Sequence, residues 1–187
     1  MVEHHPFKPF LPENARLLML GTFPPAQKRW CMEFYYPNFI NDMWRIMGLC
    51  FFDNKMYFVD EAEKKYKLNL IIPFLEEKGI ALYDTATEVI RTKNNASDKD
   101  LQIVTPTNLD AMLRQLPKCE FVITAGQLAT EVFCSHYNIY MPKVGEFSEF
   151  ALDGRCLKLY RMPSSSRAYP MKVEKKASFY NIVFKYL

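Results

Sequence analysis

The chain has 187 residues, of which 49% are hydrophobic and 24% are charged, and its formal net charge is +3. These values are typical of one globular domain over residues 1–187 and exclude a disordered or fibrous chain. The longest apolar runs are too short to span a membrane, and residues 1–15 lack a signal-peptide pattern, so we expect a cytoplasmic protein without a membrane partner.

The cysteines and histidines do not have the spacing of a metal site. The five cysteines lie far apart with no C-x-x-C pair, which predicts reduced thiols. We expect His4 and His5 to belong to a mobile terminus, and His136 stands alone. No metal or other cofactor is therefore expected.

Apolar patterning predicts strands that alternate with helices along the chain. In order, we expect a strand over 15–20, an aromatic loop, a helix over 40–52 capped by Asn41, a helix over 67–78, a strand over 80–86, a loop over 91–107, a helix within 105–118, a strand over 120–126, a helix over 127–137, a strand from 156 into a serine-rich turn, and a helix over 173–187. This order predicts an α/β fold with a four-stranded, mainly parallel sheet covered on both faces.

Four junctions would then open on one edge of the sheet, where α/β proteins bind ligands. They are GTFPP at 21–25, YDTA at 83–86, TAGQ at 124–127 and MPSSSRA at 162–168. GTFPP is neither a P-loop nor a dinucleotide fingerprint. Its prolines either hold backbone amides for an anion or a carbonyl group, or form a plain turn.

Each of the other motifs has two readings. The serine-rich turn offers hydroxyls, amides and Arg167 to a phosphate, although such turns are also common on surfaces. The aromatic residues 34–36 either stack on a base or fill the core. Asp84, at the end of an apolar strand, either meets a ligand or caps a helical turn over 85–91.

Taken in order, these motifs resemble the uracil-DNA glycosylase superfamily, most closely its hypoxanthine-DNA glycosylase branch. The matching segments are PFKPFLPENARLLMLGTFPP, FYYPNFINDMW, LYDTATEVIR with NASDKDLQ, FVITAGQLATEVF and LYRMPSSSRA. The resemblance implies a three-layer α/β/α sandwich and a metal-free enzyme that removes a damaged base from DNA.

The resemblance also implies roles for individual residues. The segment GTFPP corresponds to the family's first motif, where many relatives have a catalytic Asp or Asn, and the resemblance gives this catalytic role to Asn41 instead. Met162 stands where several relatives have histidine. Asp84 falls where many relatives use asparagine to read the base edge, and we expect it to act as a neutral acid that donates and accepts together. The implied base pocket comprises Gly21, Thr22, Phe23, Phe34, Tyr35 and Tyr36, and the implied DNA contacts are Ser164, Ser165, Ser166, Arg167 and Tyr169.

We therefore expect a monomeric, monofunctional DNA glycosylase that acts on double-stranded or single-stranded DNA. It would flip out hypoxanthine, uracil or mismatched thymine and hydrolyse the glycosidic bond, leaving an abasic site. One alternative is a non-catalytic damaged-DNA-binding protein of the same fold. Another is an α/β hydrolase of nucleosides or esters, which lacks a Gly-x-Ser-x-Gly turn and offers only His136 as a base.

Overall fold

The structure, a computed structural model, describes residues 1–93 and 98–187. Among these residues, the central sheet has five strands in the order β5-β2-β8-β10-β9. The first four are parallel, and β9 is antiparallel to β10. The strands are β5 (Ile80–Asp84), β2 (Leu17–Gly21), β8 (Phe121–Ala125), β10 (Arg155–Met162) and β9 (Phe147–Leu152).

The expected sheet of four strands is wrong because it omits β9. Residues of β9 alternate between exposed and buried, as is typical of an edge strand with one face in solvent. Asp153 and Gly154, both with positive φ, join β9 to β10. An Asp-Gly pair between two alternating runs is a strong hairpin signal, so the sequence did contain this strand.

A second sheet occupies a region where the sequence analysis predicted a helical turn and a loop. Its antiparallel strands are β1 (Val2–His4), β6 (Ala86–Arg91) and β7 (Leu101–Pro106), in the order β1-β6-β7. The alternative in which Asp84 caps a helical turn over 85–91 is therefore wrong, and the loop expected over 91–107 is wrong where β7 forms; residues 94–97 lie outside the described residues. β-Branched residues in β6 and β7 favour strands, and this preference prevails over the polar character of the segment.

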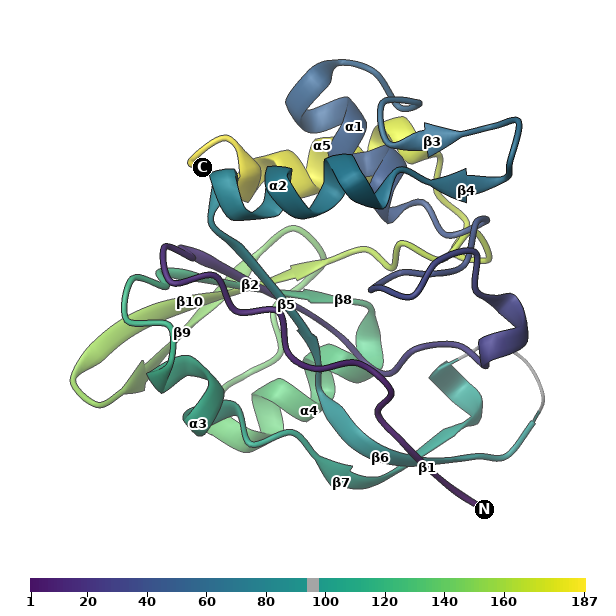
Figure 1. Cartoon of the computed structure of the whole chain (residues 1–187). Helices are drawn as coiled ribbons and strands as arrows, with labels where there is room; N and C mark the ends of the chain where they lie inside the picture. Colours follow the sequence, from purple (N-terminus) through teal and green to yellow (C-terminus); the bar gives the residue numbers. More distant parts are fainter. Residues whose placement is uncertain (94–97) are drawn as a thin grey trace.

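Helices lie on both sides of the central sheet (Figure 1). On one side are α1 (Met43–Phe52), α2 (Leu68–Lys78) and α5 (Val173–Phe184), and on the other α3 (Leu109–Arg114) and α4 (Gln127–Tyr137). The predicted helices are confirmed as elements. Short 3-10 turns at Gln27–Arg29 and Asp98–Asp100 and a small hairpin of β3 (Val59–Asp60) and β4 (Lys65–Tyr66) complete the described elements.

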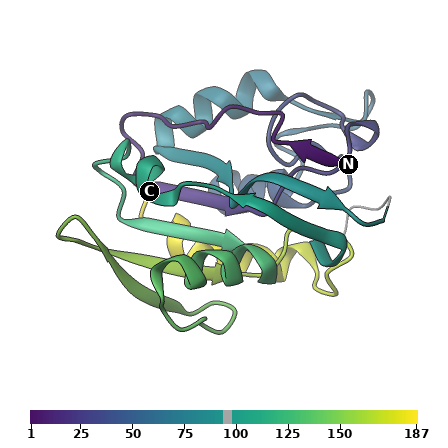
Figure 2. The same ribbon diagram turned by 90° about the horizontal axis from the view of Figure 1, so that it is seen from below.

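The result is a mixed α/β fold around a mostly parallel sheet. Strands β2 and β5 are buried along their whole length, which is why they read as continuous apolar runs rather than alternating ones. Figure 2 shows the β9–β10 hairpin on the far side of the molecule from the N-terminus. None of the described helices is long and apolar enough to cross a membrane.

The amino-terminal segment is held against the two sheets, so the expectation of a mobile terminus is wrong. β1 pairs with β6, and the His5 amide donates to the Thr87 carbonyl at 2.8 Å. Further on, Phe10 and Leu82 exchange two backbone hydrogen bonds of 3.0 and 2.9 Å. This pairing lays residues 1–10 along the edge of the central sheet beside β5.

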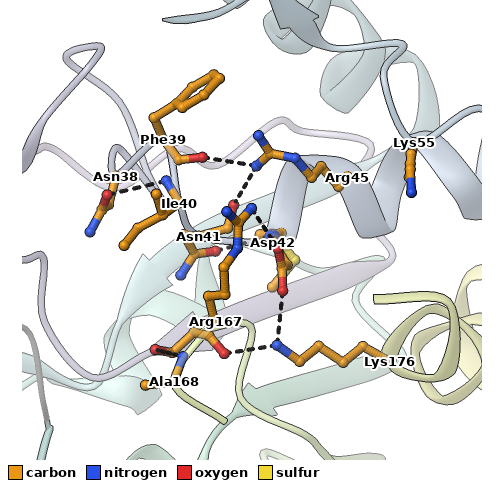
Figure 3. Close-up of polar contacts among 12 residues, drawn as sticks. Asn38, Phe39, Ile40, Asn41, Asp42, Arg45, Lys55, Arg167, Ala168 and Lys176 are labelled. Carbon is orange, nitrogen blue, oxygen red and sulfur yellow. Dashed lines mark hydrogen bonds and ion pairs between the residues drawn. The ribbon is translucent and has the colours of Figure 1, made fainter. Parts of the chain in front are cut away.

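A buried ion pair links α1, α5 and the serine-rich turn (Figure 3). The Asp42 carboxylate contacts Lys176 Nζ at 3.0 Å and Arg167 Nη2 at 3.3 Å. Lys176 is fully buried and also donates to the Ser166 carbonyl at 2.7 Å. The Asp42 amide donates to the Ser165 carbonyl at 2.9 Å. The start of α1 and the turn after β10 are therefore fixed relative to one another.

Substitution of the buried lysine tests this link. Lys176→Met keeps the apolar stem but removes the charge, leaving Asp42 with the exposed Arg167 as its charged partner. Loss of one member of a buried ion pair costs about 3–5 kcal/mol, and we expect the free energy of unfolding in urea to fall by that order. Lys175→Met, at the exposed neighbouring position, should change it by less than about 0.5 kcal/mol. Equal losses in the two variants would contradict this account.

Candidate functional site

The parallel register brings the ends of four strands to one edge of the sheet. Gly21 lies opposite Asp84 in the β2–β5 pair, and Met162 lies opposite Ala125 in the β10–β8 pair. The turns that follow these strands therefore start at the same level. A Cβ atom on Gly126 would lie 3.8 Å from Cβ of Ser164, so the start of α4 adjoins the serine-rich turn.

Gly21 permits close approach of a carboxylate to the backbone. A Cβ atom at this position would lie only 2.6 Å from Asp84 Oδ1, so any other residue would force the carboxylate to shift. Glycine here leaves room for the neighbouring carboxylate and does not serve a positive φ. Pro24 and Pro25 in the same turn are fixed through their carbonyls, which accept from Arg91 Nη2 at 3.0 Å and Trp30 Nε1 at 2.7 Å.

His5 lies against the Asp84 carboxylate, a contact that the sequence analysis missed. His5 Nε2 is 2.8 Å from Asp84 Oδ2, and the two side chains are 3% and 10% exposed. The His5 ring packs against Tyr83 and Phe23, with centroids 4.5 and 5.3 Å away. The only sequence signal was the apolar spacing of Phe7 and Phe10 after His5, which indicates a segment that packs.

A second carboxylate, that of Asp98, contacts the GTFPP turn from a distant part of the chain. The Thr22 hydroxyl donates to Asp98 Oδ2 at 2.7 Å. Burial raises the pKa of Asp98, the nearby Asp84 raises it further, and the hydrogen bond from Thr22 opposes the rise. Asp98 belongs to the matching segment NASDKDLQ but was treated only as part of a loop. The GTFPP turn, which has no acid of its own, thus has two carboxylates beside it.

The aromatic residues divide into two groups. Phe34 and Tyr35 pack against the amino-terminal segment: Phe34 contacts Phe10, and the Tyr35 hydroxyl donates to the Lys8 carbonyl at 2.6 Å, while the Tyr35 ring also lies beside His5 with centroids 6.3 Å apart. Both line an open cavity of about 570 Å³ on the side of the amino-terminal segment. Phe23 and Tyr36, in contrast, lie at the strand ends. The Tyr36 hydroxyl oxygen would be 4.0 Å from a Cβ atom on Gly21.

Asn41 lies immediately before the start of α1 and beside the serine-rich turn (Figure 3). Its Oδ1 accepts from the Met43 amide at 2.9 Å, so its side chain contacts the helix start, but it is not the N-cap residue that the sequence predicted. The formal N-cap residue is Asp42, which makes no side-chain capping bond. The Asn41 carbonyl accepts from the Tyr66 hydroxyl at 2.6 Å, which fixes the backbone.

The serine-rich turn is anchored through its carbonyl groups. Carbonyls of Pro163, Ser165 and Ser166 accept from Tyr180 Oη at 2.7 Å, the Asp42 amide at 2.9 Å and Lys176 Nζ at 2.7 Å. In a trans peptide the N–H points opposite to the C=O. The amides of residues 164 and 167 are thus directed away from these inward partners, as in an anion-binding turn.

The remaining side chains of this turn differ in exposure. Arg167 is 51% exposed and Tyr169 is half-buried, so both can reach a ligand outside the turn. Ser164 and Ser166 are half-buried, and Ser165 is buried. Met162 is fully buried at the end of β10. It fills the core at the position where the family resemblance implies histidine.

His136 does not contribute to this edge. It lies near the end of α4, where its Nε2 contacts Asp110 Oδ1 at 2.9 Å on the surface. Because α4 begins at the carboxyl edge, its last turn lies toward the opposite end of the strands. Among the described residues, no group of three or more His, Cys, Asp or Glu side chains is arranged to hold a metal ion.

Comparison with known proteins relates the chain to solved structures. No protein-family model matches the sequence, and no curated protein matches it. Among solved structures, the chain is similar to the solution NMR structure of "a putative uracil DNA glycosylase" from Methanosarcina acetivorans. The TM-score is 0.65 at 19% sequence identity, and the match covers 100% of this chain and 98% of the other. The two proteins therefore share an overall fold.

Proposed function

We propose that this protein is a monofunctional DNA glycosylase that hydrolyses the bond between a deaminated base and its deoxyribose. The observation that carries the proposal is the shared edge of the sheet, where the Asp84 carboxylate meets Gly21 and the serine-rich turn adjoins Gly126. The part around Asp84 and Gly21 suits a base, and the serine-rich turn suits a phosphate. The fold shared with a protein described as a putative uracil DNA glycosylase supports the same function.

In this proposal, the serine-rich turn binds the DNA backbone. The outward amides of residues 164 and 167 and the hydroxyls of Ser164 and Ser166 hold a phosphate, and the beginning of α4 beside Ser164 adds a favourable helix dipole. Arg167, held by Asp42, contacts a flanking phosphate or enters the gap left by the flipped nucleotide, and Tyr169 is a second wedge. Flipping costs a few kcal/mol and is least costly for a mismatched or deaminated base.

The chemistry proceeds through a sugar with oxocarbenium character. Carboxylates near such a cation stabilise it electrostatically, and Asp84 and Asp98 both lie beside the GTFPP turn. Asn41 orients the attacking water through its carboxamide, because a cationic sugar needs a placed nucleophile more than a strong base. Phe23 stacks on the base. Water then completes the reaction and leaves an abasic site.

The finer assignments are also part of the proposal. They are the hypoxanthine branch of the superfamily, its three-layer sandwich, a monomeric state, and hypoxanthine, uracil or mismatched thymine as the excised base. Duplexes that carry each lesion, end-labelled and treated with alkali, test the activity directly. We expect strand breaks at hypoxanthine or uracil. A protein that binds these duplexes without producing breaks would be a damaged-DNA-binding protein and not a glycosylase.

Replacement of Asn41 separates catalysis from binding. Asn41→Ala should bind damaged duplex normally but excise the base about 100-fold more slowly under single-turnover conditions, because the water is misplaced. Asn41→Asp retains an acceptor for the Met43 amide and controls for the helix start. Asn38→Ala removes a neighbouring asparagine that bonds only within its own loop in the contacts described and should leave the rate unchanged. An unchanged rate in Asn41→Ala would remove Asn41 from the mechanism.

Replacement of Arg167 tests the phosphate contact. Affinity for DNA depends on salt in proportion to the number of phosphates contacted. Arg167→Ala should weaken binding for all sequences and reduce the slope of log affinity against log salt by about 1. Arg114→Ala is a matched control, since Arg114 is a similarly exposed arginine paired with Asp153 away from the site. Equal slopes in Arg167→Ala and the unsubstituted protein would show that Arg167 does not contact phosphate.

A further inference from the structure

The Tyr36 hydroxyl is a buried polar group without a hydrogen-bond partner among the described residues. Buried polar groups in native proteins nearly always have partners, so such a hydroxyl points to a ligand that supplies an acceptor. The Tyr36 backbone has a φ of 51°, in the left-handed region that a bulky side chain rarely adopts.

The neighbours of Tyr36 enforce this conformation. The Tyr35 carbonyl accepts from Trp44 Nε1 at 3.1 Å, and the Pro37 carbonyl accepts from the Cys31 amide at 2.8 Å. The backbone on both sides of Tyr36 is thus fixed. The hydroxyl cannot turn to a protein partner by a small movement of the loop.

Gly21 shows where this hydroxyl lies relative to Asp84. A Cβ atom on Gly21 would be 2.6 Å from Asp84 Oδ1 and 4.0 Å from Tyr36 Oη. Both oxygens therefore lie at the carboxyl end of β2, without a hydrogen bond between them. Burial raises the pKa of the Tyr36 hydroxyl, and Asp84 raises it further, so the group remains a donor at neutral pH.

His5 occupies the other oxygen of Asp84. Its Nε2 is 2.8 Å from Asp84 Oδ2, while its Nδ1 lies 3.1 Å from the Phe7 amide nitrogen and 2.9 Å from the Phe7 carbonyl. The ring is enclosed by aromatic neighbours, so it is held in this orientation. Asp84 Oδ1 is left next to Gly21 and Tyr36.

Two of the three protonation states of the His5 ring make it a donor to Asp84. The Phe7 N–H can only donate, and when Nδ1 accepts from it, the ring proton is on Nε2 and points to Asp84. A doubly protonated ring also donates from Nε2. Only a ring protonated on Nδ1 alone would require Asp84 to be the acid, and it would leave the Phe7 N–H without this acceptor, which is costlier than an unpaired carbonyl.

We propose that the Asp84 carboxylate and the Tyr36 hydroxyl form one acceptor and one donor that read the N–H and C=O edge of a deaminated base, with His5 as the positioning residue that keeps Asp84 an acceptor. This assignment rests on the proposed function, because it assumes that a base is flipped out of the DNA and into this site. It replaces the neutral acid expected from the sequence with an ionised carboxylate, and gives the base carbonyl a separate donor.

The acceptor Asp84 and the donor Tyr36 match the N–H and C=O groups that deamination creates on the edge of a base. Hypoxanthine and uracil present a ring N–H beside a carbonyl, whereas adenine and cytosine present a ring acceptor beside an amino group. The parent bases would place a lone pair against the Asp84 carboxylate. Their amino N–H would face the Tyr36 hydroxyl, which could accept it only by turning its own hydrogen to a buried position that has no acceptor among the described residues. Guanine and thymine share the N–H and carbonyl pattern, so they must be rejected by other means, such as the cost of flipping a well-paired base.

The test measures base recognition without catalysis. The probes are two duplexes, one with 2′-fluoro-arabino-inosine opposite thymine and one with 2′-fluoro-arabino-adenosine, because the fluorine blocks hydrolysis. We expect the unsubstituted protein to prefer the inosine duplex by about 10-fold or more, as sites that hydrogen-bond a substrate reject analogues of the wrong polarity. Tyr36→Phe and His5→Leu should each lose most of this preference. His5→Gln, which can still donate to Oδ2, should recover part of it.

Controls distinguish reading of the base from support of the fold. Tyr137→Phe removes a hydroxyl bonded to Asp110 far from this edge and should leave the preference unchanged. Urea titrations show whether each variant is folded at the assay temperature. When Asp84 is already replaced by Asn, the additional substitution His5→Leu should change the preference for the inosine duplex very little. An equal loss in both backgrounds would mean that His5 acts only as a structural support.

Three results would overturn the inference. They are equal affinity of the unsubstituted protein for the two duplexes, full retention of the preference in Tyr36→Phe, and a His5 effect that is independent of Asp84. A parallel assay with unmodified deoxyinosine and alkali tests excision itself. If the preference is present but no strand breaks form, the glycosylase proposal fails while the reading pair stands.

Discussion

Asp42 is a buried carboxylate whose charge requires partners, and its partners come from two other segments of the chain. A buried charge is tolerated only when it is paired and hydrogen-bonded. Lys176 of α5 and Arg167 of the serine-rich turn supply the cations, and the Asp42 amide binds the turn at Ser165. Asn41 directly precedes Asp42. The position of Asn41 relative to the serine-rich turn therefore follows from this one ion-paired group.

Asp84 shows a different use of the same residue type. Both oxygens of Asp42 are engaged by cations from the protein. Asp84, in contrast, has one oxygen against His5 and the other beside Gly21 and Tyr36. The first arrangement stabilises the fold, and the second leaves an acceptor available beside an unpartnered donor. The number of oxygens that the protein itself occupies separates the structural carboxylate from the candidate functional one.

The apolar pattern was enough to predict the buried parallel strands and the helices, because continuous apolar runs and helical spacing are properties of local sequence. The same pattern failed for β6, β7 and β9, which are solvated on one face and therefore do not form continuous apolar runs. β6 also pairs with β1, at a distant place in the sequence. β1 and His5 were missed for a related reason. Nothing local to residues 1–5 indicates that the segment pairs with β6 and reaches Asp84.

Part of the candidate site was also predictable from the sequence, and part was not. Gly21, Asp84 and the serine-rich turn were expected at one edge because parallel strands end together, and the register places them there. Phe34 and Tyr35 pack instead on the side of the amino-terminal segment. The contacts of His5 and Asp98 with this edge could not be inferred, since each joins residues more than seventy positions apart.

The edge of the sheet takes side chains from both ends of the chain, His5 near the start and Lys176 and Tyr180 in the last helix. During synthesis, the serine-rich turn emerges from the ribosome before the helix whose lysine and tyrosine fix its carbonyls. The anchored form of the turn is therefore reached only after α5 has also emerged, and no amino-terminal fragment that ends before α5 contains it.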